Sequence, residues 1–264
     1  MSEYIKVPTM AEMAAAGEMP EVLFWVGCSG SFDDRAKKIT KAIVKILHSA
    51  GVKFAVLGTE ESCTGDPAKR AGNEFLFQMQ AMMNIQVLDG YGIKNIITGC
   101  PHCFNTIKNE YPGLGGNYQI QHHSQFIQSL INDGKLTIQG GGVFKGKRIT
   151  FHDPCYLGRG NNVYEAPRSL IEKLDAELVE MKRCKSKGLC CGAGGAQMWK
   201  EAEPGNKEIN VERTEEALEI KPSVIATGCP FCNTMMTDGV KNFNKEDETQ
   251  VLDVAELIAQ ANDL

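Results

Sequence analysis

The sequence lacks an excess of positive charge. Its 264 residues contain 28 Lys and Arg against 33 Asp and Glu, so the formal net charge is −5 at pH 7. Proteins that bind nucleic acids present a basic face to the phosphate backbone, and this charge balance argues against that class of partner. The hydrophobic content of 42% and the charged content of 23% are those of an ordinary globular protein.

Long apolar runs are also missing. No apolar segment approaches the roughly 18 residues of a membrane-spanning helix. The first residues, MSEYIKVPTMAEMAAAGEMP, contain no basic segment followed by an apolar one, which is the pattern of a secretory signal. We therefore expect a cytoplasmic protein, and the sequence leaves open that a partner holds it at the inner face of a membrane.

Common catalytic motifs are absent as well. No Ser/His/Asp array and no phosphate-binding P-loop is evident. The glycine-rich stretch at 192–197, GAGGAQ, does not follow a strand and lacks the GxGxxG register of a dinucleotide-binding loop. These absences leave cysteine as the residue type that carries the chemistry.

Cysteine is abundant, with ten residues. Disulfides are rare in a reducing compartment, so this number indicates metal binding or catalysis before structural cross-links, with small buried hydrophobes as the alternative for several of them. Cys190 and Cys191 are adjacent and precede three glycines in four residues. A packed core does not require such a flexible loop, so the two cysteines are expected to belong to a binding or catalytic site.

Eight of the cysteines repeat at a nearly constant offset. Two cysteines of the first half lie 127 residues before a cysteine of the second half, and two others lie 129 residues before one. The flanking sequences IITGCPHCFNTIKN at 96–109 and VIATGCPFCNTMMTD at 224–238 also match. Together these matches predict an internal duplication. The pairs are Cys28 and Cys155, Cys63 and Cys190, Cys100 and Cys229, and Cys103 and Cys232.

The duplication defines the expected domains. An N-terminal extension covers 1–21, the first cysteine-rich domain covers 22–137, and the second covers 147–264. A linker at 138–146 joins the two domains and contains a run of glycines.

Each half alternates strands with helices, which predicts the α/β class: an internally duplicated fold with two similar parallel-sheet halves. Sites in such sheets form at the carboxyl ends of strands, where the repeated cysteines fall. We also expect a single long helix over 67–90, with Met79, Met82 and Met83 packed in the core. The expected strands are 21–28, 53–58, 94–100 and 118–121, then 147–155, 176–182, 222–229 and 249–254.

The spacing of the cysteines bears on the group they bind. A structural zinc site uses four ligands, usually in two close-spaced pairs, whereas each half here has a single CxxC. Iron–sulfur clusters are held by cysteine thiolates and accept ligands from separate loops. The spacing therefore favours iron–sulfur clusters, with zinc and thiol redox chemistry as the alternatives.

The second half carries a resemblance to a known family. Cys155, the CysCysGly at 190–192 and the CysProPheCys at 229–232 resemble the CCG, or cysteine-rich, domain family. Its members include the B subunit of heterodisulfide reductase and the iron–sulfur subunits of glycolate oxidase, anaerobic glycerol-3-phosphate dehydrogenase and lactate utilisation. The resemblance covers the whole chain in two copies. The segment DPAKRAGNEFLFQMQA is similar to a branch that works with electron-transfer flavoproteins or membrane quinone systems.

The resemblance implies cluster ligands. In the heterodisulfide reductase branch, five cysteines of a full motif bind a noncubane [4Fe–4S] cluster, in which adjacent thiolates reach different irons. The cluster would be the catalytic group if this protein is catalytic, and no other catalytic residue is implied. Carried over to this sequence, the ligands are Cys155, Cys190, Cys191, Cys229 and Cys232.

The first half departs from the pattern. Thr64 stands where the second adjacent cysteine would be, so a noncubane cluster there is doubtful. Four thiolates suffice for an ordinary cubane cluster or for zinc, and a vestigial site is the third alternative. The four remaining cysteines are Cys28, Cys63, Cys100 and Cys103.

The resemblance implies an iron–sulfur electron-transfer or catalytic subunit of an oxidoreductase complex, similar to the B subunit of heterodisulfide reductase. It would pass electrons between a flavin or ferredoxin-type partner and a disulfide, quinone or 2-hydroxy-acid system. The sequence contains no C-x2-C-x2-C-x3-C-P run. We therefore expect a ferredoxin-like iron–sulfur subunit, a flavoprotein subunit, or both, as partners. The alternative is a zinc-binding structural or assembly protein without redox activity.

Three further residues have two interpretations each. His152 precedes Cys155 by three residues and either hydrogen-bonds a cluster sulfur or is structural. Arg159 either offsets an anionic cluster or is a surface residue. Cys184 lies outside the repeat, and we expect an ordinary thiol there.

Overall fold

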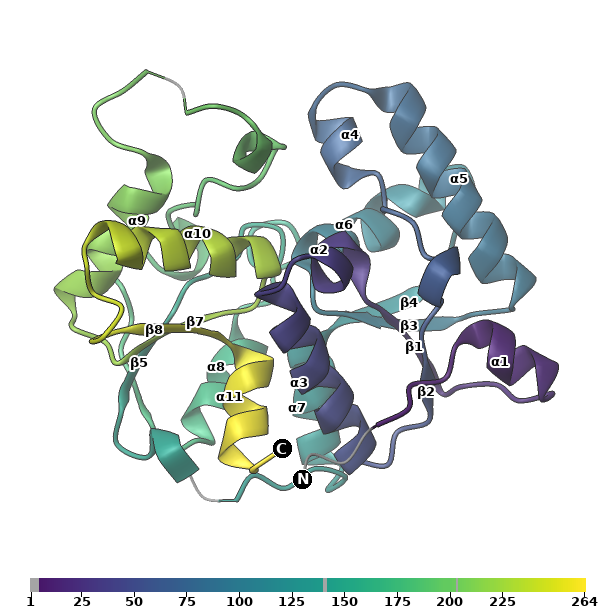
Figure 1. Ribbon diagram of the computed structural model, residues 1–264, viewed down its shortest axis with the longest axis horizontal. Helices are drawn as coiled ribbons and strands as arrows, with labels where there is room; N and C mark the ends of the chain where they lie inside the picture. The colour runs from purple at the N-terminus through teal and green to yellow at the C-terminus, as the bar shows by residue number, and fades with distance from the viewer. Residues whose placement is uncertain (1–4, 140–141, 203) are drawn as a thin grey trace. The chain divides into compact units, whose positions relative to one another are not determined.

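The computed structural model describes residues 5–139, 142–202 and 204–264, and the chain divides into two compact units between Thr137 and Ile138. Residues 1–4 of the predicted N-terminal extension and 140–141 of the predicted linker lie outside the described residues. Each unit contains a four-stranded parallel sheet with helices on both faces (Figure 1). The expected α/β fold with two similar halves is thereby confirmed.

The first unit has the strand order β2-β1-β3-β4, and all neighbours are parallel. Helices α3 and α7 lie on one face of the sheet and α5 on the other (Figure 1). Its strands are β1 Val22–Trp25, β2 Phe54–Ala55, β3 Asn95–Thr98 and β4 Gln119–His122. Its helices are α1 Met10–Ala15, α2 Gly27–Phe32, α3 Ala36–Ser49, α4 Asp66–Arg70, α5 Glu74–Gly90, α6 Pro101–Asn105 and α7 His123–Asn132.

The second unit repeats this topology with the strand order β6-β5-β7-β8, again parallel throughout. Helices α9 and α10 lie on one face of the sheet and α8 and α11 on the other (Figure 1). Its strands are β5 Arg148–Phe151, β6 Glu177–Leu178, β7 Val224–Thr227 and β8 Gln250–Asp253. Its helices are α8 Glu165–Glu172, α9 Ile209–Glu219, α10 Pro230–Asn242 and α11 Val254–Ala261.

The central strands are short apolar runs because both of their faces are covered. All four residues of β1, VLFW, and all four of β7, VIAT, are buried. Such continuous burial is the mark of parallel strands that lie between two layers of helices. In each unit some of the cysteines directly follow the two central strands, and the rest lie in the loop after the edge strand. The fold therefore brings them all to one edge of the sheet.

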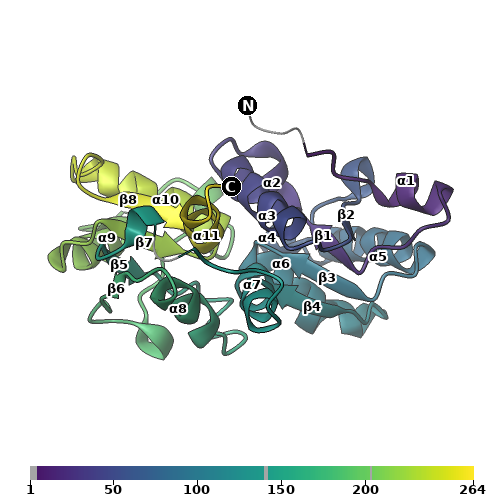
Figure 2. The same cartoon turned by 90° about the horizontal axis from the view of Figure 1, so that it is seen from below.

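The edge strand β2 has a further neighbour from the N-terminal segment. Thr9 forms a parallel bridge with Val56, and it caps α1 through a reciprocal hydrogen-bond pair with Glu12. Figure 2 shows α1 beside β2 at this edge of the sheet. A covered edge strand presents fewer unpaired backbone groups to other chains. Among the described residues no helix combines the length and the apolar character that a bilayer crossing requires.

The predicted long helix over 67–90 is wrong in one respect, because it is two helices. Gly72, with φ of +88°, ends the turn after α4, and the Asn73 side chain then accepts a hydrogen bond from the N–H of Leu76 to cap α5. A left-handed residue stops a helix, and an Asn cap starts another.

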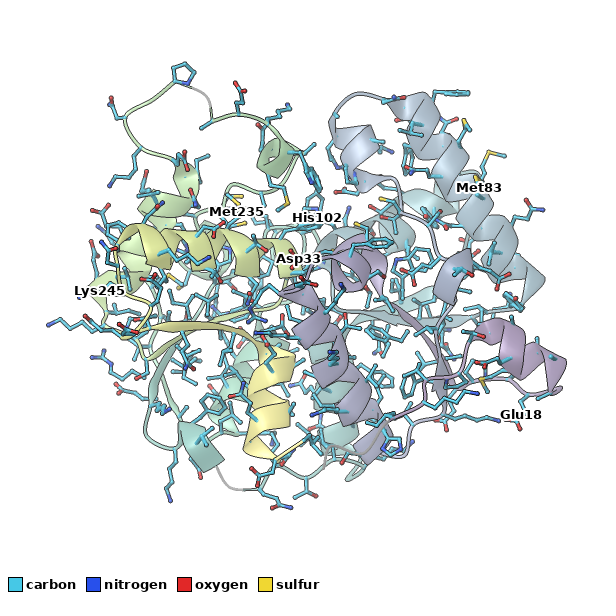
Figure 3. All side chains as sticks on the ribbon, viewed as in Figure 1. Glu18, Asp33, Met83, His102, Met235 and Lys245 are labelled. Atoms are coloured by element: carbon cyan, nitrogen blue, oxygen red, sulfur yellow. The ribbon has the colours of Figure 1, made fainter. Side chains whose placement is uncertain are left out.

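The expected burial of three methionines on α5 is also wrong. Met79, Met82 and Met83 are 45%, 59% and 58% exposed, and Met83 points outward from the helix (Figure 3). The buried face of α5 is instead formed by other residues, which recur at helical spacing. They are Phe77, Ala81, Asn84, Ile85 and Leu88.

Candidate functional site

The four repeated cysteines of the first unit lie beyond the carboxyl ends of its strands. Cys28 is in α2 directly after β1, and Cys63 is in the loop that follows β2. Cys100 follows β3 as the N-cap of α6, and Cys103 lies in the first turn of that helix. Pro101 begins α6, where its missing N–H costs no hydrogen bond, so the two CxxC sulfurs belong to one helix start.

These four thiols come together. Cys28 hydrogen-bonds Cys63, and Cys100 hydrogen-bonds Cys103. The hydrogen bond with Cys100 and burial raise the pKa of Cys103, and negative charge on Cys28 or Cys63 raises it further. A Cβ added to Gly27 beside Cys28 would lie 3.4 Å from the Cys103 sulfur. The hydrogen bond from Cys28 lowers the pKa of Cys63 to about 7, whereas donation to Cys63 raises the pKa of Cys28. One thiolate is therefore favoured near neutral pH.

The second unit arranges five cysteines in the same way. Cys155 lies in the turn after β5, and Cys190 and Cys191 lie in the loop before α9. Cys229 follows β7 as the N-cap of α10, and Cys232 lies in its first turn. The two units thus place equivalent cysteines on equivalent elements.

Hydrogen bonds connect these five thiols into one chain. Cys155 contacts Cys190, which contacts Cys191, and Cys229 contacts Cys232. The Cys191 and Cys232 sulfurs lie in hydrogen-bond contact at 3.2 Å. Donation from Cys155 and then Cys191 lowers the pKa of Cys190 far below that of an ordinary thiol. The thiolate is again favoured at the position equivalent to Cys63.

A left-handed glycine follows the middle cysteine in both units. Gly65 and Gly192 have φ values of +88° and +89°, which residues with a Cβ rarely adopt. This turn points the N–H of Gly65 at the Cys63 sulfur at 3.5 Å and the N–H of Gly192 at the Cys190 sulfur at 3.3 Å. The glycines therefore supply backbone donors to a sulfur.

Thr64 takes the place of Cys191 in the first unit. It is 2% exposed, and its hydroxyl donates to the Cys103 sulfur at 3.9 Å, the counterpart of the contact between Cys191 and Cys232. The first unit therefore keeps the arrangement but offers four thiols.

The Cys63 loop is held by α5 and by the segment after α6. Asn84 is 1% exposed and donates to the carbonyl of Cys63 and to the Tyr111 hydroxyl, both at 3.0 Å. The Tyr111 hydroxyl donates to the carbonyl of Thr64 at 3.3 Å. The Glu61 carboxylate also accepts hydrogen bonds from the backbone N–H groups of Val26 and Gly27 at the start of α2. The loop and α2 are thus joined around the thiols.

The Cys155 turn is held by a buried ion pair. Arg168, 3% exposed, donates to both oxygens of Asp153 at 2.8 and 3.0 Å and to both oxygens of Glu180. Asp153 also accepts from the backbone N–H of Lys185 at 2.7 Å. These contacts fix the turn through paired, hydrogen-bonded charges.

Arg159 contacts the site directly. Its guanidinium donates to the Cys155 sulfur at 2.9 Å and to the carbonyl of Gly188 at 2.7 Å. Arg159 is therefore in contact with a cysteine of the set, and the interpretation that its charge offsets an anionic cluster stays a prediction.

His152 is buried beside the second set of thiols. A ring nitrogen of His152 and the sulfurs of Cys191 and Cys232 lie within 4.8 Å of one another. Its Nδ1 accepts a hydrogen bond from Arg213 at 3.0 Å. Burial, and then the charge of Arg213, lower the pKa of His152 to about 3, so the ring is neutral.

Two residues near the repeated cysteines have other surroundings. His102, between two cysteines of the first unit, pairs through Nδ1 with the buried Asp66 carboxylate at 2.9 Å. Cys184 lies beside Glu180, and burial raises its pKa. We assign neither residue to the set of thiols.

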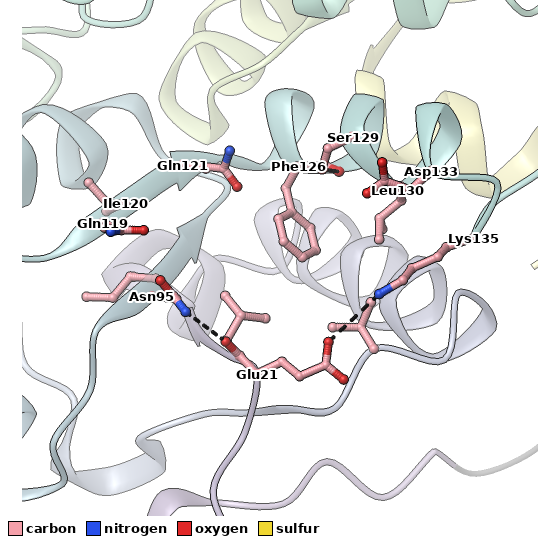
Figure 4. A pocket seen from close by; sticks show the side chains of 13 residues that line it. Glu21, Asn95, Gln119, Ile120, Gln121, Phe126, Ser129, Leu130, Asp133 and Lys135 are labelled. Carbon is pink, nitrogen blue, oxygen red and sulfur yellow. Dashed lines mark hydrogen bonds and ion pairs between the residues drawn. The ribbon is translucent and has the colours of Figure 1, made fainter.

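One cavity of the first unit lies away from the thiols. A cavity of about 470 Å³ is lined by the amino-terminal ends of the strands, including Glu21, Asn95 and Gln119 (Figure 4). Lys135 is 4.0 Å from the Glu21 carboxylate there. Since the cysteines lie at the carboxyl ends, this cavity belongs to the opposite edge of the sheet.

The donor sets fit an iron–sulfur cluster better than a single zinc ion. His152, Cys191 and Cys232 alone could ligate one metal ion, but that would leave three neighbouring thiols unused. A cluster accepts several thiolates and the backbone N–H donors of Gly65 and Gly192.

The sequence did not reveal the residues that surround the thiols. Arg213 lies in the charged stretch VERTEEALE, which has the pattern of a solvent-exposed helix, yet it is fully buried. Glu61 and Asn84 also carry no signal of their roles, because their partners are backbone groups of distant segments.

Comparison with known proteins shows what the chain is similar to. The family model of the cysteine-rich domain (CCG) matches twice, at residues 22–108 and 149–237. The chain is 47% identical over 97% of its length to the probable iron–sulfur-binding oxidoreductase FadF of Bacillus subtilis. It is 43% identical over 93% of its length to the EtfAB:quinone oxidoreductase of Syntrophomonas wolfei. It is 32% identical over 91% of its length to the D subunit of the dihydromethanophenazine:CoB–CoM heterodisulfide reductase of Methanosarcina barkeri.

These relatives are longer proteins. The chain covers 36% of the Bacillus protein, 35% of the Syntrophomonas protein and 59% of the Methanosarcina protein.

The two matches to the family model confirm the resemblance to the family of cysteine-rich domains. The likeness to the B subunit of heterodisulfide reductase in particular stays a prediction.

Proposed function

Because this chain belongs to the cysteine-rich (CCG) domain family, we propose that it is an iron–sulfur electron-transfer module of an oxidoreductase complex. The observation that carries the proposal is the unbroken chain of contacts among five thiols in the second unit. The names of its relatives, which describe iron–sulfur and quinone oxidoreductases, support the same chemistry.

We propose one [4Fe–4S] cluster in each unit. In the second unit five cysteines would hold it, in the noncubane form that two adjacent thiolates allow: Cys155, Cys190, Cys191, Cys229 and Cys232. In the first unit four cysteines would hold a cubane cluster, with zinc as the alternative: Cys28, Cys63, Cys100 and Cys103.

The partners follow from the same reasoning. Of the routes that the family serves, transfer from a flavoprotein to a quinone is favoured by the name of the Syntrophomonas relative, EtfAB:quinone oxidoreductase. Disulfide reduction remains the second route, favoured by the name of the heterodisulfide reductase relative from Methanosarcina. A partner or a further part of a longer chain would supply the input cluster and the association with the inner face of a membrane.

Iron and acid-labile sulfide per chain, measured after anaerobic purification together with EPR spectra, test this proposal. We expect about eight irons and eight sulfides if both units are filled, and about four if only the second is. The double variant Cys190→Ser/Cys191→Ser should lose the signal of the second cluster. Cys184→Ser is the matched control and should lose none.

Zinc in stoichiometric amount without sulfide, even after anaerobic reconstitution, would contradict the electron-transfer function. It would instead support a zinc-binding structural protein of the same fold. Visible absorption separates the two cases on the same sample, because zinc thiolates are colourless.

A further inference from the structure

One buried nitrogen beside the second set of cysteines has no partner. His152 is 0% exposed, and its Nε2 makes no hydrogen bond to any of the described residues. The ring lies next to the sulfurs of Cys191 and Cys232. An unsatisfied buried donor or acceptor is unfavourable, so a group that satisfies this nitrogen is expected at the site.

The other ring nitrogen determines which tautomer is present. The Nε–H of Arg213 donates to Nδ1 of His152, and a guanidinium has no lone pair with which to accept. Nδ1 is therefore the acceptor. A neutral imidazole whose Nδ1 accepts a hydrogen bond carries its proton on Nε2. Nε2 is the ring nitrogen that Arg213 does not contact.

Arg213 is itself held in place by α9 and its neighbours. It is 0% exposed, and its Nη1 donates to the carbonyl of Arg183 at 2.8 Å and to the Glu216 carboxylate at 3.2 Å. Glu216 is in turn bound by the Arg183 side chain at 2.8 Å. The orientation of the imidazole is thus set by Arg213 of α9 together with Arg183, which lies in the segment before Cys190.

We propose that Arg213 and His152 form a positioning pair that directs one N–H at a sulfur of the group held by the second set of cysteines. The inference rests on the proposed function, since the acceptor is a thiolate or sulfide of an iron–sulfur cluster. His152 acts as a donor and not as a ligand, because ligation through Nε2 needs the lone pair that this tautomer lacks. Such a hydrogen bond strengthens as the cluster gains negative charge, so it raises the reduction potential.

Pulsed EPR on the anaerobically purified chain, labelled with 15N-histidine, tests the contact. In the paramagnetic state of the second cluster we expect a weak nitrogen coupling and an exchangeable proton close to the cluster. The histidine nitrogen coupling should be missing in His152→Leu, and the exchangeable-proton signal should weaken there to the part that the Gly192 N–H and Arg159 supply. A strong coupling typical of a ligand nitrogen, or no coupling at all in the wild type, would overturn the proposal, and the wild-type result holds even if a variant fails to load.

EPR-monitored redox titration tests the effect. His152→Leu should shift the reduction equilibrium of the second cluster about tenfold toward the oxidised form, which is about 59 mV for a one-electron couple. His152→Gln offers an amide N–H in a similar place and should recover part of the shift. Arg213→Met should shift the potential in the same direction as His152→Leu. His48→Leu, at an exposed position on α3, should leave the potential unchanged.

The two proposals fail in different ways. An unchanged potential in His152→Leu with iron and sulfide still bound overturns the positioning pair and leaves the electron-transfer function standing. A wild-type protein that binds no iron and sulfide overturns both.

Discussion

Thr64 and Cys191 occupy equivalent places in the two units and differ in the atom that they present. The Thr64 hydroxyl reaches the Cys103 sulfur at 3.9 Å, and the Cys191 thiol reaches the Cys232 sulfur at 3.2 Å. A hydroxyl is a poor ligand for iron in a thiolate cluster, whereas a thiolate is its usual ligand. This single position therefore decides whether a unit offers four or five thiolates.

We predict that Thr64→Cys gives the first unit the donor set of the second. The EPR signal of the first cluster should change toward that of the second, with iron content unchanged. The reverse variant, Cys191→Thr, should change the second signal toward the first. First-unit spectra that Thr64→Cys does not alter would show that this position lies outside the cluster's ligands.

Spacing alone was enough to group eight cysteines into two sets, because duplication fixes their offsets, and Cys191 joins the second set as the neighbour of Cys190. Cys184 falls outside this pattern. The residues that fix those cysteines could not be found in this way. Arg213 reaches His152 across 61 residues of sequence, and Asn84 holds the Cys63 carbonyl across 21. Such partners are determined by tertiary packing, and a single sequence carries no periodic signal for them.

At the scale of elements, α5 is apolar on two faces, of which one is buried. Phe77, 2% exposed, packs against Gly65 behind the Cys63 loop, whereas Met79 and Met83 face solvent. An apolar residue on this helix therefore does not by itself indicate the core, which is why the sequence prediction for the methionines was wrong.

The two faces of α5 should respond differently to substitution. Phe77→Ala should lower the free energy of unfolding by about 3–5 kcal/mol, because it leaves a cavity behind the Cys63 loop. Met79→Lys/Met83→Lys should change it by about 0.5 kcal/mol or less, as exposed substitutions do. Urea denaturation of the three proteins measures both. A large loss in the double lysine variant would mean that this face is covered.

The Cys155 turn depends on Arg168. Arg168→Leu leaves the Asp153 carboxylate buried without its partner, and we expect a loss of about 3–5 kcal/mol in the free energy of unfolding. Arg148→Leu is the matched control, since its contact with Glu177 is exposed and worth about 1 kcal/mol or less. Urea denaturation measures the difference. Equal losses in the two variants would refute the anchoring role of Arg168.

Element boundaries were less predictable than element types. The edge strands β2 and β6 have two residues each, although the apolar runs that predicted them cover 53–58 and 176–182. An edge strand has one neighbour in its sheet, so its paired length depends on that neighbour and not on its own composition. The break between α4 and α5 has a similar cause, since a glycine and an Asn cap act locally within a long apolar pattern.

At the scale of the whole molecule, the two units share one framework and differ in charge beside the thiols. In the second unit Arg159 donates to the Cys155 sulfur and to the carbonyl of Gly188. The position equivalent to Gly188 in the first unit is Glu61, whose carboxylate holds the start of α2. A cation stabilises added negative charge on a neighbouring cluster, and an ionised carboxylate does the opposite. Burial raises the pKa of Glu61 to about 7, so its effect is complete only above that pH.

We therefore predict that the second cluster is reduced at a higher potential than the first. Arg159→Gln should lower the second potential and Glu61→Gln should raise the first, each by about tenfold in the reduction equilibrium, or about 60 mV for one electron. The exposure of Arg159 keeps the effect this modest. EPR-monitored redox titration follows the signals of the two clusters separately. The signal that is lost in Cys190→Ser/Cys191→Ser belongs to the second cluster. The reverse order of potentials would show that these charges do not dominate.

The sequential order of the two units has a consequence for biosynthesis. All four thiols of the first unit, from Cys28 to Cys103, leave the ribosome before Cys155, and each unit has its own sheet and core. Domains fold as units, the N-terminal one first, as the chain emerges. The first unit can therefore fold, and take up the group proposed for it, while the second is still being made, and its four thiols are in place before the five of the second unit.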